Sequence, residues 1–165
     1  MSVASGPEPP IVRRARTFLS HAVYGLILTL ATVGELIRHG SDARESVAWI
    51  LGAGGVLLVA HLFSDVLAET AATQRDPSRA DLLRVGREDI GVASGFLGAA
   101  SIMAVAAIGD LNARTALVVC VVVGLLGVAA LSFHATAHLR QLVRVTIALL
   151  SALLGVVIVV LENTV

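Results

Sequence analysis

The chain has 165 residues, of which 56% are hydrophobic and 15% are charged, and its formal net charge at pH 7 is zero. A soluble domain carries about 25% charged residues, so this composition leaves too little polar surface to cover a globule in water. With four Phe, one Trp, one Tyr and no excess of positive charge, the chain also lacks the stacking platform and basic groove that nucleic-acid binding needs. The composition therefore predicts an integral membrane protein.

The first element in chain order is a tail over residues 1–16, which is rich in Gly and Pro and has no hydrophobic periodicity. We expect this tail to be flexible and cytoplasmic and to precede a single domain over residues 17–165. Basic residues before an apolar run also occur in secretory signals. However, the run here is near spanning length, and residues 31–35 do not form a convincing cleavage site.

Five apolar runs follow the tail, and each is close to the roughly 20 residues that a helix needs to cross a hydrocarbon core about 30 Å thick. Charged or turn-forming residues separate them. The sequence therefore predicts an all-α bundle of five transmembrane helices in one domain. The helices cover approximately residues 18–37, 47–68, 90–108, 115–133 and 142–161.

The longest connection covers residues 70–89 and mixes apolar with basic residues. Leu82 and Leu83, beside Arg84 and Arg87, would suit a helix on the inner headgroup layer, where arginine meets anionic lipid. An ordinary polar loop is the alternative.

Arginine placement tests this segmentation independently, because cytoplasmic loops keep positive charge and translocated loops lose it. All twelve basic residues are arginine, which suggests a GC-rich genome. Nine lie in the tail, in connection 70–89, between the last two runs or at the start of the fifth run, whereas Arg38, Arg44 and Arg114 lie on the other side. We therefore expect a multi-pass protein of the bacterial plasma membrane with its N-terminus in the cytoplasm and its C-terminus outside.

Small residues predict the faces on which helices pack, because two backbones approach closely where side chains are small. Glycine recurs at spacings of three and four residues in the third run, and the fifth run has a small pair at i and i+4. Packing within one subunit is the simpler interpretation, and a homo-oligomer or a membrane partner protein is the alternative. The predicted packing residues are Gly91, Gly95, Gly98 and Gly155.

Ionisable groups inside a membrane need a partner or a function, since each costs about 2.5 to 3.5 kcal/mol at the centre on insertion scales. His61, Asp65 and Glu69 stand at i, i+4 and i+8 and form one stripe on the second predicted helix. The predicted topology places His21 at the same membrane face, where Asp89 begins the third helix. The ion-path candidates are His21, His61, Asp65 and Glu69.

His134 and His138 share the i, i+4 spacing that lets two imidazoles ligate one metal, although hydrogen bonding at the interface is the simpler interpretation. Together with the ion-path candidates they would make a cytoplasm-facing cavity for protons or for a divalent cation such as zinc, manganese or ferrous iron. The alternative is that the acids solvate helix ends and the histidines hydrogen-bond between helices. No other cofactor is indicated. The single cysteine excludes an intramolecular disulfide, a four-cysteine zinc site and an iron–sulfur cluster.

Common catalytic motifs do not occur in the sequence, which has no Gly-x-x-x-x-Gly-Lys loop, no Gly-x-Ser-x-Gly elbow and no His-Glu-x-x-His pair. Enzymes of those types are disfavoured, and a membrane enzyme acting on lipid would need a metal or acid–base site at the inner face. The leading hypothesis is a small cation or proton transporter or channel. The alternative is a non-catalytic membrane scaffold or a subunit of a membrane complex.

Short motifs connect the chain to known families. Residues 24–27 (Tyr-Gly-Leu-Ile), His61 with Glu69, and residues 153–155 (Leu-Leu-Gly) resemble those of a family of uncharacterised small five-helix integral membrane proteins from actinobacteria. That resemblance covers nearly the whole chain and implies a five-helix design with no assigned activity.

More remotely, the order of five helices with an acidic connection between the second and third is similar to the vacuolar iron transporter family. That family carries an aspartate before a glycine in its first helix, where this sequence has Tyr24 before Gly25. Its cytoplasmic loop is also longer and richer in glutamate. The resemblance therefore implies architecture alone, and no iron-site residue is transferred.

Overall fold

Five helices make up the described part of the chain, and they confirm the predicted all-α fold. The computed structural model describes residues 10–76, 78–137 and 139–164, and no strand occurs among them. Because the first helix begins at residue 10, the last part of the tail predicted over residues 1–16 is helical, while residues 1–9 lie outside the described part. The helices are α1 (Pro10–His39), α2 (Ala43–Thr73), α3 (Arg79–Ile108), α4 (Ala113–Ala135) and α5 (Gln141–Thr164).

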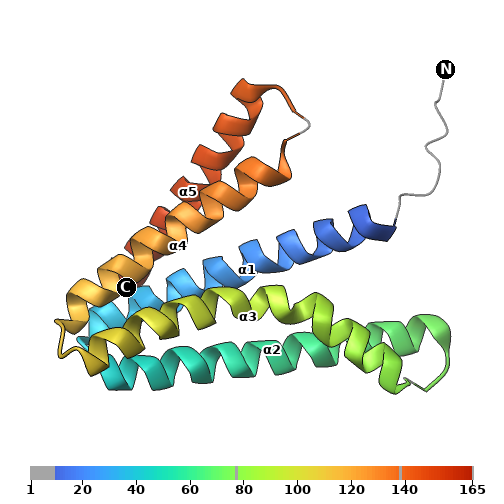
Figure 1. The fold of residues 1–165 in the computed structure, drawn as a ribbon, viewed down its shortest axis with the longest axis horizontal. Coiled ribbons are helices and arrows are strands. Elements are labelled where there is room, and N and C mark those ends of the chain that lie inside the picture. The colour runs from blue at the N-terminus through green and yellow to red at the C-terminus, as the bar shows by residue number, and fades with distance from the viewer. Residues whose placement is uncertain (1–9, 77, 138, 165) are drawn as a thin grey trace.

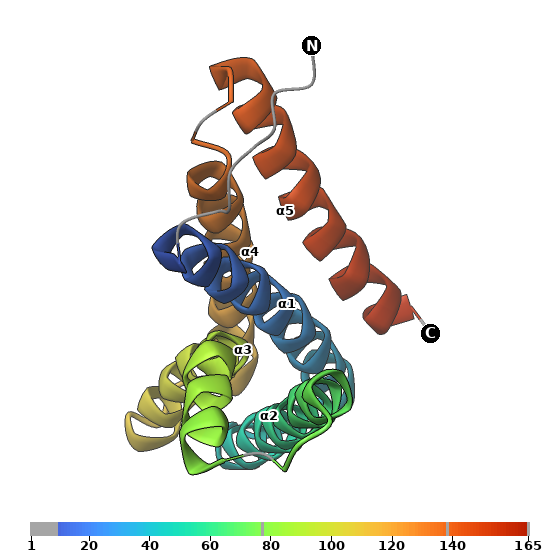
Figure 2. The same ribbon diagram turned by 90° about the vertical axis from the view of Figure 1, so that its right-hand side faces the viewer.

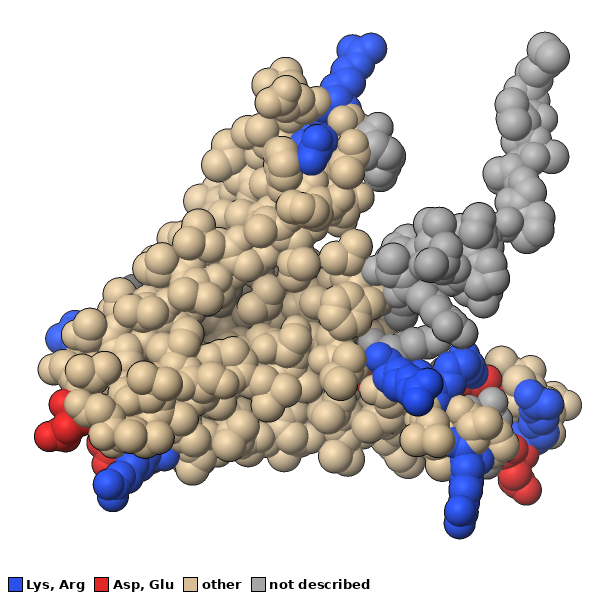
Figure 3. Space-filling view, in the orientation of Figure 1, with Lys and Arg blue, Asp and Glu red and all other residues tan. Residues whose placement is uncertain are grey.

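Each of the five described helices contains a segment long and apolar enough to cross a membrane. On the face shown in Figure 3, charged side chains gather at the ends of the helices and the surface between them is uncharged. Large apolar side chains such as Trp49, Phe63 and Leu150 are exposed along the helices. Lipid, in contrast to water, does not penalise such a surface, so the chain has the character of a multi-pass integral membrane protein.

The connection between α2 and α3 is much shorter than predicted. α2 extends to Thr73 and α3 begins at Arg79, so the link narrows from residues 70–89 to residues 74–78. The described residues of this region form neither a separate headgroup helix nor a long polar loop, because most of them belong to α3, with Leu82 in the first turns. The charged residues of this region thus continue the two helices beyond their apolar segments.

Two short turns lie together at one end of the bundle, between α1 and α2 and between α3 and α4 (Figure 1). We call this the turn end, and the opposite end, where residues 74–78 link α2 to α3, the hairpin end. Gly40 in the first turn has a left-handed φ of 68°, which glycine adopts without strain. Asp42 and Asn112 cap α2 and α4 by accepting backbone hydrogen bonds of 2.8 and 3.1 Å.

α1 lies at the centre of the bundle and packs closely on α3 through glycine. A Cβ added at Gly25 would lie 2.1 Å from the backbone oxygen of Val92, and one at Gly91 would lie 2.9 Å from the backbone oxygen of Phe18. Gly95 meets α1 one turn further along. These distances leave no room for a side chain, so glycine is what permits the contact.

The other two predicted packing glycines behave differently. No described heavy atom lies within 4 Å of a Cβ built at Gly98. Gly98 lies roughly 60° around α3 from Gly95 at 3.6 residues per turn, and therefore off the row that meets α1. Gly155 of α5 does pack, since its Cβ would lie 2.6 Å from the side chain of Leu125 on α4.

The main apolar core lies among α1, α2, α3 and α4 and includes Val33, Ile50, Phe96 and Leu117. α4 crosses α1 obliquely, and α5 packs on α4 and α1 on the side away from α2 (Figure 2). Most side chains of α5 are exposed. α4 and α5 therefore form a hairpin on one side of the three helices α1, α2 and α3.

Candidate functional site

Four ionisable side chains from three helices meet toward the hairpin end of the bundle. One ligating atom from each lies within 4.8 Å of the ligating atoms of the other three. Three of the four are ion-path candidates from the sequence, and the structure brings them together with one further acid. We call this set the His/Asp cluster, and it consists of His21 of α1, His61 and Asp65 of α2, and Asp89 of α3.

The close contact between α1 and α3 sets His21 against Asp89. Gly91, which follows Asp89 by two residues, lies against the backbone of α1 at Phe18 and Ala22, so α3 presents Asp89 at the level of His21. His21 Nδ1 lies 3.3 Å from Asp89 Oδ1. The Asp89 side chain is 0% exposed and that of His21 is 18% exposed, so Asp89 forms the floor of the cluster and His21 lies at its rim.

Ring contacts hold His61 in place. Its ring stacks on Tyr24 with centroids 5.9 Å apart and an interplanar angle of 25°. The ring of His21 approaches it edge-on, at 4.8 Å and 86°. His61 Nε2 is buried and has no hydrogen-bond partner among the described residues. Because burying a polar atom without a partner is unfavourable, this nitrogen is a candidate to bind a ligand.

The His/Asp cluster lies near one edge of the apolar span. From Ala43 to His61, α2 rises about 27 Å at 1.5 Å per residue, against a hydrocarbon core about 30 Å thick. Residues 22–34, 46–60 and 90–108 contain no Asp, Glu, Arg or His. These stretches of α1, α2 and α3 therefore supply no charged side chain between the cluster and the turn end.

Glu69, the fourth ion-path candidate, is not part of the cluster. Its carboxylate accepts hydrogen bonds from Arg84 of α3, which lies across the hairpin from it. The i, i+4, i+8 spacing places Glu69 on the same stripe as Asp65 one turn further toward the hairpin end. At that level α3 offers an arginine, so Glu69 forms an ion pair that joins the extensions of α2 and α3.

The histidine pair predicted as a metal site on the fourth helix lies away from the cluster. His134 is exposed, and its Nδ1 lies 3.2 Å from the carbonyl oxygen of Ala130. His138 lies outside the described residues. Since α4 diverges from α1 toward this end (Figure 1), His134 is not among the side chains that meet at the cluster. A metal bound by His134 and His138 stays a prediction.

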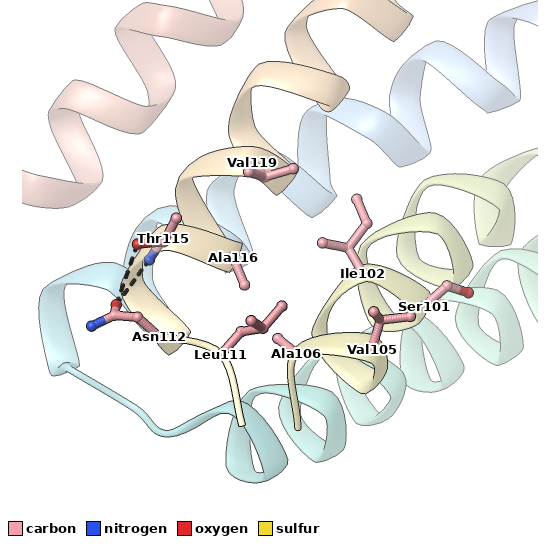
Figure 4. A pocket seen from close by; sticks show the side chains of 9 residues that line it. All are labelled: Ser101, Ile102, Val105, Ala106, Leu111, Asn112, Thr115, Ala116 and Val119. Carbon is pink, nitrogen blue, oxygen red and sulfur yellow. Dashed lines mark hydrogen bonds between the residues drawn. The ribbon is translucent and has the colours of Figure 1, made fainter. Parts of the chain in front are cut away.

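An apolar hollow of about 490 Å³ lies at the turn end between α3 and α4 (Figure 4). Its polar side chains are already hydrogen-bonded, because Ser101 Oγ donates to the carbonyl oxygen of Leu97 and Asn112 Oδ1 accepts from the backbone N–H of Thr115. The hollow thus offers apolar contact and no reactive group. It lies at the opposite end of the helices from the His/Asp cluster.

The donor atoms of the cluster suit a transition-metal dication. Imidazole nitrogen and carboxylate oxygen bind zinc at about 2.0 to 2.2 Å, which in tetrahedral geometry separates the ligand atoms by roughly 3.3 to 3.6 Å. The ligating atoms here lie within 4.8 Å of one another. Binding would therefore close the cluster by about an ångström, which rotation within side-chain rotamer wells can supply.

Comparison with known proteins adds no assignment. No protein-family model, no curated protein and no solved structure matches the chain. The chemistry of the site is a better guide to function than the fold.

Proposed function

We propose that the protein is a small membrane transporter or channel that passes a cation or a proton along a path that includes the His/Asp cluster. The convergence of His21, His61, Asp65 and Asp89 from three helices supports this function. Ionisable side chains within membrane-spanning segments are rare and commonly mark ion and proton pathways. Four such groups around one point are expected where a charge is bound.

The distribution of arginine supports an orientation with the N-terminus in the cytoplasm and the C-terminus outside, in a bacterial plasma membrane. In this orientation the hairpin end faces the cytoplasm. Arg75, Arg79, Arg84 and Arg87 then lie beside the anionic headgroups of the inner leaflet. The cluster takes up its ion from the cytoplasmic side.

Flux measurements on the full chain in lipid vesicles test this proposal. Entrapped fluorescent dyes would follow the entry of Zn²⁺, of Mn²⁺ and of protons. The double variant His61→Ala, Asp65→Ala is expected to lower the flux of the transported ion by at least about tenfold, because it removes two of the binding groups. His134→Ala is the matched control and keeps the flux. Equal flux in the wild type and the double variant would contradict transport through the cluster.

A second candidate function is a non-catalytic scaffold or a subunit of a membrane complex. The uncharged stretches 22–34, 46–60 and 90–108 favour it, because they provide no charged side chain for a path from the cluster to the turn end. In this role the cluster orders α1, α2 and α3. Native mass spectrometry after mild extraction checks it, and a strictly monomeric protein without a co-purifying partner would exclude it.

A further inference from the structure

The geometry points to a site for one transition-metal dication of the Zn²⁺ or Fe²⁺ class, with His21, His61, Asp65 and Asp89 as ligands. This inference deepens the proposed function and rests on it for the role of the ion, because it names the class of cation that the path carries. The binding of the ion is a separate property, which the protein shows or lacks whether or not it transports.

The donor atoms separate this class of cation from the others. Ca²⁺ takes six to eight oxygen ligands, and Mg²⁺ keeps several waters and binds through one or two carboxylates. Two of the four donors here are imidazole nitrogens, on His21 and His61. Imidazole suits zinc and iron, and two imidazoles with two carboxylates complete the four-coordinate shell that zinc prefers.

The buried nitrogen of His61 is a second and independent observation. A buried ring nitrogen of histidine normally has a hydrogen-bond partner. Among the described residues His61 Nε2 has none, although the atom is buried. One ring nitrogen of His61 lies within 4.8 Å of the ligating atoms of the other three residues.

The arrangement of the helices shows what a bound ion would do. α1 and α2 each pack extensively on α3 and make few contacts with each other. The cluster spans the space between them, with His21 on α1, His61 on α2 and the buried Asp89 on α3. A single ion would therefore join three helices, and we expect Zn²⁺ to raise the thermal stability of the protein as a ligand of the folded state does.

Tyr24 is a positioning residue in this site, because its ring stacks on His61 without supplying a ligand. Tyr24→Phe keeps the stacked ring and is expected to leave the zinc affinity within about twofold of wild type. Tyr24→Ala removes it and is expected to weaken zinc binding about tenfold, in the range for residues that orient a metal ligand. Rescue by the phenylalanine variant separates this role from a direct contact of the phenol with the ion.

Titration of the purified full-length protein in detergent with Zn²⁺ tests the site. We expect one Zn²⁺ per chain, no displacement by excess Mg²⁺ or Ca²⁺, and, with Co²⁺ as probe, the visible absorption of a tetrahedral nitrogen and oxygen shell. His61→Ala and Asp89→Asn are each expected to weaken binding by at least about 100-fold, since the first removes a ligand and the second replaces a charged carboxylate by a neutral amide. Should Asp89→Asn fail to fold, Asp65→Asn at the half-buried side of the cluster gives the same measurement.

Two control variants keep the test specific. Glu69→Gln and the double variant His134→Ala, His138→Ala are expected to bind zinc as the wild type does, because neither changes the cluster. Absence of stoichiometric zinc binding, or binding that depends on the His134 and His138 pair and not on His61, overturns the inference. Zinc binding without any flux upholds the site and contradicts transport, whereas proton flux without zinc binding upholds transport and contradicts the site.

Discussion

α1 and α3 meet almost backbone to backbone, whereas the α4–α5 hairpin is held through side chains. Gly25 of α1 leaves only 2.1 Å between an added Cβ and the backbone oxygen of Val92. Gly155 of α5 faces the side chain of Leu125 at 2.6 Å, and hydrogen bonds between the two helices run from Ser132 to Ser151 and from Arg144 to the carbonyl oxygen of Phe133. The first region carries buried ionisable groups, while residues 113–161 contain no Asp or Glu.

The difference between the two regions shows what a polar site within a membrane requires. Asp89 is fully buried because α3 lies against α1 at Gly91, close enough for His21 to reach it. A hairpin that packs through leucine side chains holds its helices further apart, and an ionisable group there would face lipid. The close contact between α1 and α3 is therefore what makes a buried ionisable site possible.

The largest effect is expected when the close contact itself is broken. Gly25→Ala places a Cβ against the backbone of Val92, which cannot move without separating α1 from α3. We expect a loss of about 3 kcal/mol of stability, at the upper end of overpacking effects, and a loss of zinc affinity as well. Denaturation of the detergent-solubilised protein followed by circular dichroism measures the first.

Gly52→Ala is the matched control for Gly25→Ala. No described atom lies within 4 Å of a Cβ at Gly52, which is exposed on α2. Replacing a helical glycine by alanine there is expected to be neutral or to stabilise by up to about 1 kcal/mol. Equal stability of the two variants would show that the contact between α1 and α3 is looser than described.

A smaller effect is expected from the equivalent change in the hairpin. A Cβ at Gly155 meets Leu125 Cδ2, the far end of a flexible side chain that can rotate away. Gly155→Ala should therefore cost about 1 kcal/mol, and zinc affinity should not change, because α5 supplies no ligand. A loss of zinc binding in this variant would mean that the hairpin supports the cluster.

The smallest effect is expected at the serine hydrogen bond between α4 and α5. Ser132 Oγ donates to Ser151 Oγ at 3.0 Å, and Ser151 in turn donates to the carbonyl oxygen of Ile147. Ser132→Ala should cost about 0.6 kcal/mol, the average for such bonds between membrane helices. A cost several times larger in the same denaturation assay would show that polar contacts, and not apolar ones, hold the hairpin.

The number and order of the helices could be predicted from the sequence, because the apolar runs and the membrane thickness fix them together. The ends of the helices could not be predicted, since the apolar run ends at the first charged residues while the helix continues. Glu69 and Arg84 lie beyond the predicted ends of their apolar runs, and their ion pair continues the helices there. Charge marks the edge of the apolar layer and not the end of a helix.

The site could be predicted in part. Helical spacing placed His61 and Asp65 on one stripe, and topology placed His21 at the same level. Which stripes face each other depends on the packing of α1 on α3, which hydropathy does not encode. Asp89 could have been identified from its position at that same membrane face. Tyr24 could have been identified from its i+3 spacing from His21, which places both on one side of the helix. The ion pair between Glu69 and Arg84 joins two helices, and no local sequence pattern predicts it.

The placement of the cluster near one edge of the apolar span has an electrical consequence. In the proposed transport, an ion that enters from the hairpin end would reach His61 with most of the thickness of the membrane still ahead of it. It would therefore have crossed little of the transmembrane voltage, and its affinity should hardly change when the voltage is altered. Nearly all of the membrane potential would then fall along the remaining uncharged stretches. Moving one elementary charge across the full potential is worth about 2.3 kcal/mol for each 100 mV.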